Sequence, residues 1–107
     1  MKENSCVNKV MLMGRIIKEP RWHVSGGERI LCFSLLTIEQ IGREATTTHT
    51  ETHDIKIGER LINVHDLNKG ALVYVQGRLQ TQQFTDEQAI RRYRTFISAQ
   101  SVNLITV

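Results

Sequence analysis

The stretch that decides the fold is Asn68–Ile97, NKGALVYVQGRLQTQQFTDEQAIRRYRTFI. It predicts a turn, a long strand, a second turn past Phe84 and a second strand rich in arginine. Residues 67–107 carry five basic and two acidic side chains, and this difference equals the whole net charge of +3. A basic β-hairpin that carries an aromatic ring is typical of a surface that receives a polyanion and stacks its bases.

The rest of the chain is patterned mainly as strands. Apolar residues that alternate with polar ones, or run continuously, predict five strands over residues 7–17, 29–39, 50–57, 71–83 and 91–102. An approximate helical stripe over 60–67, ended by Asn68-Lys69-Gly70, predicts one short helix between the third and fourth strands. This order predicts an all-β OB-fold, a five-stranded Greek-key barrel, and Gly14 and Gly77 in mid-strand suit its curvature.

Length and composition predict one domain over residues 1–107, with flexible ends at 1–6 and 106–107. The polar, threonine-rich residues 42–50 predict a mobile loop. No signal peptide and no membrane span are predicted, because the N-terminus is polar and no apolar run is long enough. Cys6 and Cys32 lack the paired spacing of a zinc site, so we expect reduced thiols in a cytoplasmic protein.

The chain resembles the bacterial and mitochondrial single-stranded DNA-binding proteins over about residues 7–105. The matching residues are Val7-Asn8-Lys9-Val10 with Leu12 and Gly14, Pro20, Thr50-Glu51 with His53, and above all Lys69-Gly70, VYVQGRLQTQQFTD and RRY. The resemblance implies an OB fold and sequence-independent binding of single-stranded DNA in replication, recombination or repair. It also implies no cofactor, a nucleoid-associated location in the cytoplasm, and a homo-oligomer, for which a tetramer is expected rather than a dimer.

The chain departs from the family at the positions that stack bases. These positions are typically aromatic, but here they fall at Ile41, Thr52 and Phe84 and near Ile57-Gly58, so only Phe84 keeps a ring. Each stacked base contributes about 1–3 kcal/mol, so binding is expected to be weaker unless other residues substitute. Basic residues that often flank the last position are replaced by Gln80, Gln82 and Gln83.

The candidate DNA-binding residues are basic side chains and two rings: Arg15, Trp22, Lys56, Lys69, Arg78, Phe84, Arg91, Arg92 and Arg94. We expect the cations to contact phosphates and the rings to stack bases. Trp22 and the arginine cluster with Tyr93 are the candidate substitutes for the lost platforms. Arg91 and Arg92 point to opposite faces of a strand, so only part of the cluster lies along one groove.

The candidate oligomer interface comprises Lys9, Met11 and Met13, which share a strand face, and His53, which matches an interface histidine of the family. His49, Glu51 and His53 also share one strand face, as metal ligands could. A polar sheet face or a subunit contact is the favoured interpretation, and no metal site is predicted.

Catalysis is not predicted, because no nucleophile–base pair, phosphate-binding loop or suitably spaced carboxylate pair is present. The resemblance implies a flexible acidic C-terminal tail that recruits replication and repair enzymes, but the given sequence stops at Val107, shortly past the fifth strand. Either the tail is naturally absent or it lies outside this chain, so the recruiting function cannot be carried over. The alternative function is a tailless accessory module of a replication-restart assembly. Such a module would resemble primosomal replication protein N and would bind DNA weakly.

Overall fold

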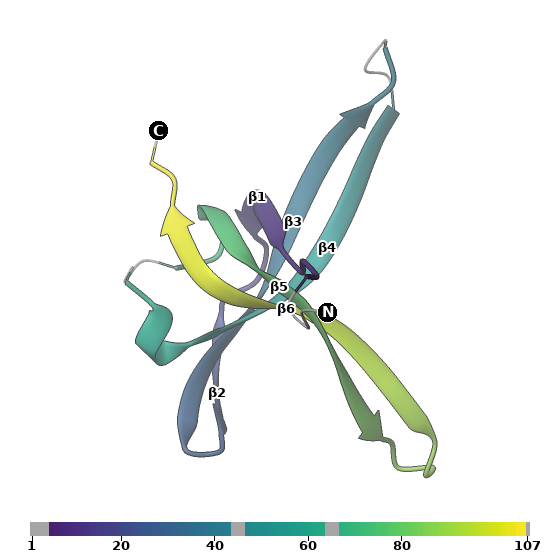
Figure 1. The fold of residues 1–107 in the computed structure, drawn as a ribbon. Helices are drawn as coiled ribbons and strands as arrows, with labels where there is room; N and C mark the ends of the chain where they lie inside the picture. Colours follow the sequence, from purple (N-terminus) through teal and green to yellow (C-terminus); the bar gives the residue numbers. More distant parts are fainter. Residues whose placement is uncertain (1–4, 44–46, 64–66, 107) are drawn as a thin grey trace.

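A computed structural model describes residues 5–43, 47–63 and 67–106. Within these residues the chain forms six strands and one short 3₁₀-helix, η1, and no helix is long and apolar enough to cross a membrane. The elements are β1 (Val10–Ile16), β2 (Arg21–Ser25), β3 (Glu28–Ile41), β4 (Thr47–Gly58), η1 (Glu59–Leu61), β5 (Leu72–Thr85) and β6 (Arg91–Leu104) (Figure 1).

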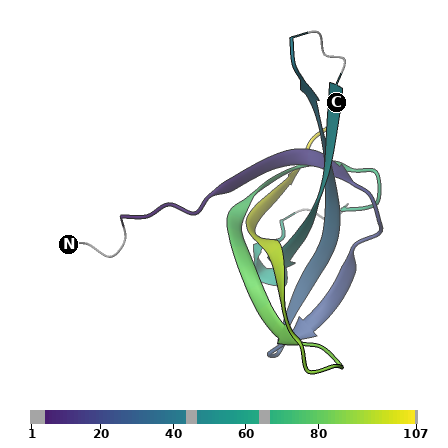
Figure 2. The ribbon, with the colours of Figure 1, turned by 90° about the vertical axis from the view of Figure 1, so that its right-hand side faces the viewer.

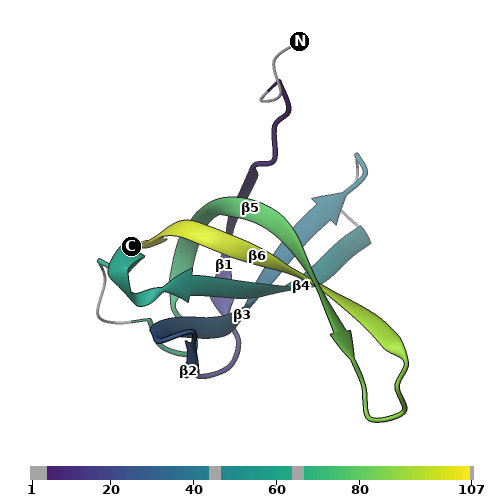
Figure 3. The ribbon, with the colours of Figure 1, turned by 60° about the horizontal axis from the view of Figure 1, so that its bottom comes forward.

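Five of the strands close into a barrel. β1 pairs antiparallel with both β5 and β3, β5 with β6, and β3 with β4. The ring is completed by β4 and β6, which run parallel with Ile55 beside Ile97 (Figure 3). β2 continues the path of β1 along β3 after a break that contains Pro20, which has no backbone N–H to donate. The predicted five-stranded OB-fold barrel is therefore confirmed, with its first strand in two halves.

The barrel interior holds the apolar residues that the alternation assigned to one face. Its most buried side chains, each at most 1% exposed, are Ile16, Leu35, Ile55, Ile57, Val73 and Val75. The two mid-strand glycines lie where strands approach closely. A Cβ on Gly14 would collide with the carbonyl oxygen of Leu36, and one on Gly77 would lie 2.8 Å from the Cα of Ala99. Gly77 also adjoins a register shift between β5 and β6, so both glycines serve the curvature.

Two sequence predictions need correction. The helix expected over residues 60–67 is only the 3₁₀ turn Glu59–Leu61, because Ile62 adopts an extended backbone that ends it; residues 64–66 lie outside the described part. The loop expected over residues 42–50 is shorter, since Thr47–Thr50 already pair with β3; residues 44–46 lie outside the described part. Threonine is β-branched and favours strand geometry. This part of the β3–β4 pairing extends beyond the core, so it needs no bulky apolar face.

Two long hairpins extend beyond the barrel, β3–β4 on one side and β5–β6 on another (Figure 1). Residues 5–9 run away from the barrel ahead of β1 (Figure 2). The Asn8 amide anchors this segment, because it donates to the Leu79 carbonyl at 2.8 Å and accepts from the Leu79 N–H at 2.9 Å. Leu79 faces the same way as the buried Val75 but is 51% exposed, since the β5–β6 hairpin leaves the barrel there.

Candidate nucleic-acid interface

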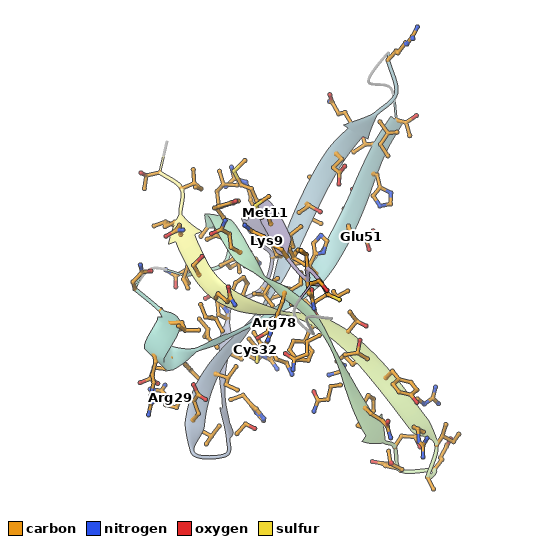
Figure 4. The ribbon with its side chains drawn as sticks, in the orientation of Figure 1. Lys9, Met11, Arg29, Cys32, Glu51 and Arg78 are labelled. Carbon is orange, nitrogen blue, oxygen red and sulfur yellow. The ribbon has the colours of Figure 1, made fainter. Side chains whose placement is uncertain are left out.

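A row of side chains crosses four strands on the outer face of the barrel. Cys32 of β3 pairs with Lys56 of β4, Lys56 with Ser98 of β6, and Ser98 with Arg78 of β5. Paired residues share a sheet face, and neighbouring strands lie about 4.8 Å apart. Figure 4 shows Cys32 and Arg78 in the middle of the molecule, where the strands cross. The outer face therefore carries a lysine and an arginine two strands apart.

Rings and cations continue this face along the β5–β6 hairpin. The cross-strand pairs that follow are Gln80 with Phe96, Gln82 with Arg94, and Phe84 with Arg92. The Lys56 ammonium lies 4.3 Å from the centroid of the Phe96 ring and donates to Gln82 Oε1 at 3.4 Å. The Arg94 guanidinium carbon lies 5.6 Å from the centroid of the Phe84 ring. Two aromatic rings, each accompanied by a cation, thus share one surface.

Two cavities meet at Lys56 and Phe96, and together they form what we call the groove. The first cavity, about 680 Å³, has five cations in its wall: Lys18, Arg21, Lys56, Lys69 and Arg94. The second, about 450 Å³, is lined mainly by uncharged residues, among them Gln80, Gln82 and Ser98. The groove therefore offers one strongly basic compartment beside one of polar, neutral character.

The cations of the first cavity outnumber its acidic side chains. Glu19 and Asp54 also line it, but none of its five cations forms an ion pair with any residue in the described ranges. Cys32 lies at the base of this wall, where burial raises the pKa of its thiol although nearby Lys56 acts in the opposite direction. Burial thus disfavours the thiolate, and the charge of the cavity wall comes from its five cations and two carboxylates.

The profile of the single-strand binding protein family matches residues 7–105. The chain belongs to this family. A single-stranded DNA-binding protein of Rickettsia conorii is 32% identical over 104 residues, which cover 91% of this chain and 68% of that protein. One from Neisseria meningitidis serogroup A is 30% identical, with 92% and 60% covered.

Solved structures of the family agree with this assignment. The Plasmodium falciparum SSB complex with ssDNA superposes with a TM-score of 0.75 at 34% identity, covering 98% of this chain and 97% of that one. A single-stranded DNA-binding protein from Thermus aquaticus, at 21% identity and a TM-score of 0.75, shares the fold. The predicted family, barrel and class of function are confirmed.

Six of the nine candidate DNA-binding residues lie in the groove or on the same outer face of the barrel and its β5–β6 hairpin: Lys56, Lys69, Arg78, Phe84, Arg92 and Arg94. Arg92 is already engaged, since its Nε donates to Asp86 Oδ2 at 2.9 Å. Arg91 pairs with Thr85 on the opposite face of the hairpin, as the alternation predicted. Arg15 lines neither cavity, and its guanidinium donates to the Gly70 carbonyl at 3.0 Å.

Trp22 stays outside the groove. It pairs with Leu31, whose side chain is in the core, so Trp22 faces the other side of the β2–β3 hairpin from Arg21 and Cys32. There it lines a separate cavity of about 430 Å³. The Arg29 guanidinium lies 4.2 Å above its ring and forms an ion pair with Glu59 at 3.1 Å. The predicted use of Trp22 as a DNA-stacking ring gains no geometric support.

Phe96 is the groove residue that sequence reasoning missed. Its signal was the alternation Arg92, Arg94, Phe96, which places the ring on the arginine face of one strand. The sequence could not show that this face adjoins Lys56, because that proximity depends on the parallel register between β4 and β6. At two of the positions where the family carries a stacking ring, this chain has no aromatic side chain on the surface. Ile57 is 1% exposed in the core, and Thr52 is an exposed strand residue.

The candidate interface residues divide between two faces. Met11 and Met13 are 57% and 59% exposed on the outer face of β1, opposite Gln76 and Tyr74 of β5. Figure 4 places Lys9 beside Met11 at this strand. His53 lies on the core-facing side of β4, half-buried, with its Nε2 2.9 Å from the hydroxyl of Thr37.

The triad considered for metal binding is only partly assembled. The His49 Nε2 is 2.9 Å from Glu51 Oε2, whereas His53 is engaged by a threonine. Within residues 5–43, 47–63 and 67–106, no cluster of three histidine, cysteine or acidic side chains could hold a metal ion.

Proposed function

We propose that the groove binds single-stranded DNA without sequence preference, and that the chain acts without catalysis in replication, recombination or repair. The observation that carries this proposal is the wall of five cations, none of them ion-paired with a described residue, around a ring on the outer barrel face. Membership in the single-strand binding protein family supports the same conclusion. The phosphates would meet the cations of the first cavity, and the bases would lie against rings.

The lining of the second cavity supports tolerance of sequence. Gln80, Gln82 and Ser98 each both donate and accept hydrogen bonds, so they can adapt to any base edge. Stacking adds no preference either, because every base has a π face.

A salt titration tests the proposal. The affinity for an oligothymidine of about 35 nucleotides should fall linearly with salt on logarithmic axes, with a slope of about −0.7 for each phosphate neutralised. Occupation of all five cations would give a slope near −3.5 per chain. A mixed-sequence strand should bind equally well, and a duplex of that length should bind more weakly. A salt-independent affinity, or a preference for the duplex, would contradict the proposal.

We also propose a homo-oligomer, a tetramer rather than a dimer, that uses Lys9, Met11, Met13 and His53. The exposed methionines of β1 support an interface on that face. We place the protein in the cytoplasm, at the nucleoid, with replication proteins as possible partners. The mass in solution tests the assembly. A dimer that binds oligothymidine only in the micromolar range would favour the alternative accessory module. The absence of aromatic side chains at Ile41 and Thr52 supports that alternative.

A further inference from the structure

We propose that Phe96 is the main base-stacking residue of this chain, and that Lys56 leaves its ring to bind the phosphate of the stacked nucleotide. The ligand of this subsite is thus one nucleotide of a single strand, its base on Phe96 and its phosphate on Lys56 with Arg94. The inference rests on the proposed function and deepens it, because it names the residue that takes over from the missing family rings.

The position of Phe96 carries the first step. The ring is half-buried and lines both cavities of the groove, so it is held in place while open space lies on either side. Phe84 is more exposed, at 39%, and stands near the tip of the hairpin. Phe84 pairs with Arg92, four residues before Phe96 on β6, so the two rings lie about 13 Å apart along the strand. Each ring would therefore serve a different nucleotide.

The cation above the ring carries the second step. The Lys56 ammonium lies over the face of the Phe96 ring, 4.3 Å from its centroid, because the ring face attracts positive charge. Among the described residues no carboxylate pairs with Lys56, and its other contact is a long hydrogen bond of 3.4 Å to Gln82. Its flexible stem lets the ammonium exchange the ring for a phosphate oxygen, which is the stronger partner. A base then takes the vacated ring face.

The location also explains how the groove compensates for lost rings. Lys56 shares the outer face of β4 with Thr52, one of the positions where the family carries a ring. Phe96 stands on the adjacent strand β6, next to Lys56 across the parallel pair Lys56–Ser98. This chain therefore has an aromatic side chain on β6, one strand away from the β4 position at which the family carries its ring.

Fluorescence tests the stacking directly. The chain has a single tryptophan, so Trp22→Phe gives a tryptophan-free background, into which Phe96→Trp places one reporter. We expect oligothymidine to quench this reporter on binding, as base stacking does, and to leave the native Trp22 emission of the unaltered protein nearly unchanged. A reporter at position 96 that stays unquenched while the oligonucleotide binds would overturn the inference.

Affinity provides the second readout. Phe96→Leu keeps an apolar side chain without the ring and should weaken oligothymidine binding about 10- to 100-fold. An abasic strand of equal length, which keeps the phosphates, should bind both forms equally. Trp22→Leu, which removes a ring that lines a separate cavity outside the groove, is the matched control and should change affinity less than about twofold. The unfolding midpoint of each variant verifies its fold.

The outcomes separate this inference from the proposed function. Oligothymidine binding by the unaltered protein, together with unchanged affinity in Phe96→Leu, would overturn only the Phe96 subsite. Equal losses for the abasic and the base-bearing strand would also overturn it, because the ring would then act only through phosphate placement. An unaltered protein that binds no oligothymidine at all would overturn both proposals.

Discussion

Two aromatic rings of this protein each carry a cation at nearly the same distance, yet their surroundings differ. Arg29 lies 4.2 Å from the Trp22 ring and Lys56 lies 4.3 Å from the Phe96 ring. Arg29, labelled in Figure 4, is also paired with Glu59, the first residue of η1, at 3.1 Å. Lys56 has no acidic partner among the residues that the structure describes.

The difference separates a structural contact from a binding contact. At Trp22 the positive charge of Arg29 is balanced by the carboxylate of Glu59. These contacts join the β2–β3 hairpin to η1. The Phe96 pair leaves one positive charge uncompensated and lies among further cations. A polyanion gains attraction only at the second pair, because at the first it would have to compete with Glu59.

Charge reversal should give the largest effect. Lys56→Glu places a carboxylate beside the incoming phosphates, so affinity for oligothymidine at low salt should fall about 100-fold. Arg29→Glu makes the same change of two charge units outside the groove and should alter affinity less than about threefold. Fluorescence anisotropy titrations of both variants at one salt concentration check this. Equal losses would show that only net charge matters and would remove the distinction between the two pairs.

Replacement of the other ring should affect stability rather than binding. Trp22→Leu removes the cation–π contact with Arg29 and part of the apolar burial, so the free energy of unfolding should fall by about 1 kcal/mol. Urea denaturation measures this loss. The affinity for oligothymidine should stay within about twofold of the unaltered protein, because Trp22 lines a different cavity from the groove. A large loss of affinity in the stable variant would instead place Trp22 on the DNA path.

Acid pH should produce the smallest effect, a loss of stability at the ion pair between Arg92 and Asp86. Arg92, like Arg29, is a cation with a carboxylate partner. The hydrogen bond from the Ile90 N–H, followed by that from Arg92, holds the pKa of Asp86 below its ordinary value. A lowered folded-state pKa means that the ionised Asp86 stabilises the hairpin above about pH 4, and that this contribution is lost as the pH falls through the folded-state pKa. The stability difference between the unaltered protein and Asp86→Asn should therefore be constant near neutrality and shrink in acid. Urea midpoints measured across pH test it; a difference that grows in acid would refute the assignment.

The sequence predicted the fold well where burial enforced a period. The alternation of Val73 and Val75 with polar neighbours gave the strand and its inner face correctly, because a shift of one residue would expose the core. The short helix predicted between the third and fourth strands is present, but as the 3₁₀ turn Glu59–Leu61, which ends at the extended Ile62. A four-residue apolar stripe is too short to fix the type and the bounds of a helix. The loop over residues 42–50 was predicted too long because strand pairing outside the core needs no apolar pattern.

The candidate site was predicted in its charges and only partly in its rings. Lys56, Arg78 and Arg94 were named from residue type and strand placement, and the structure sets them on one outer face. The sequence offers Trp22 as a candidate because it is a ring beside Arg21 and His23, but hairpin register turns it away from the groove. Phe96 was passed over because its partner Lys56 is distant in sequence.

By itself, the sequence determined the barrel, the family and the charge of its C-terminal hairpin, because period-two burial and residue type are local properties of the chain. Only the tertiary structure decided which ring meets which cation. That choice depends on closure of the barrel, which lays β4 parallel to β6 and sets Lys56 over Phe96. It depends equally on the β2–β3 hairpin and η1, which bring Arg29 and Glu59 together and so neutralise the cation beside Trp22.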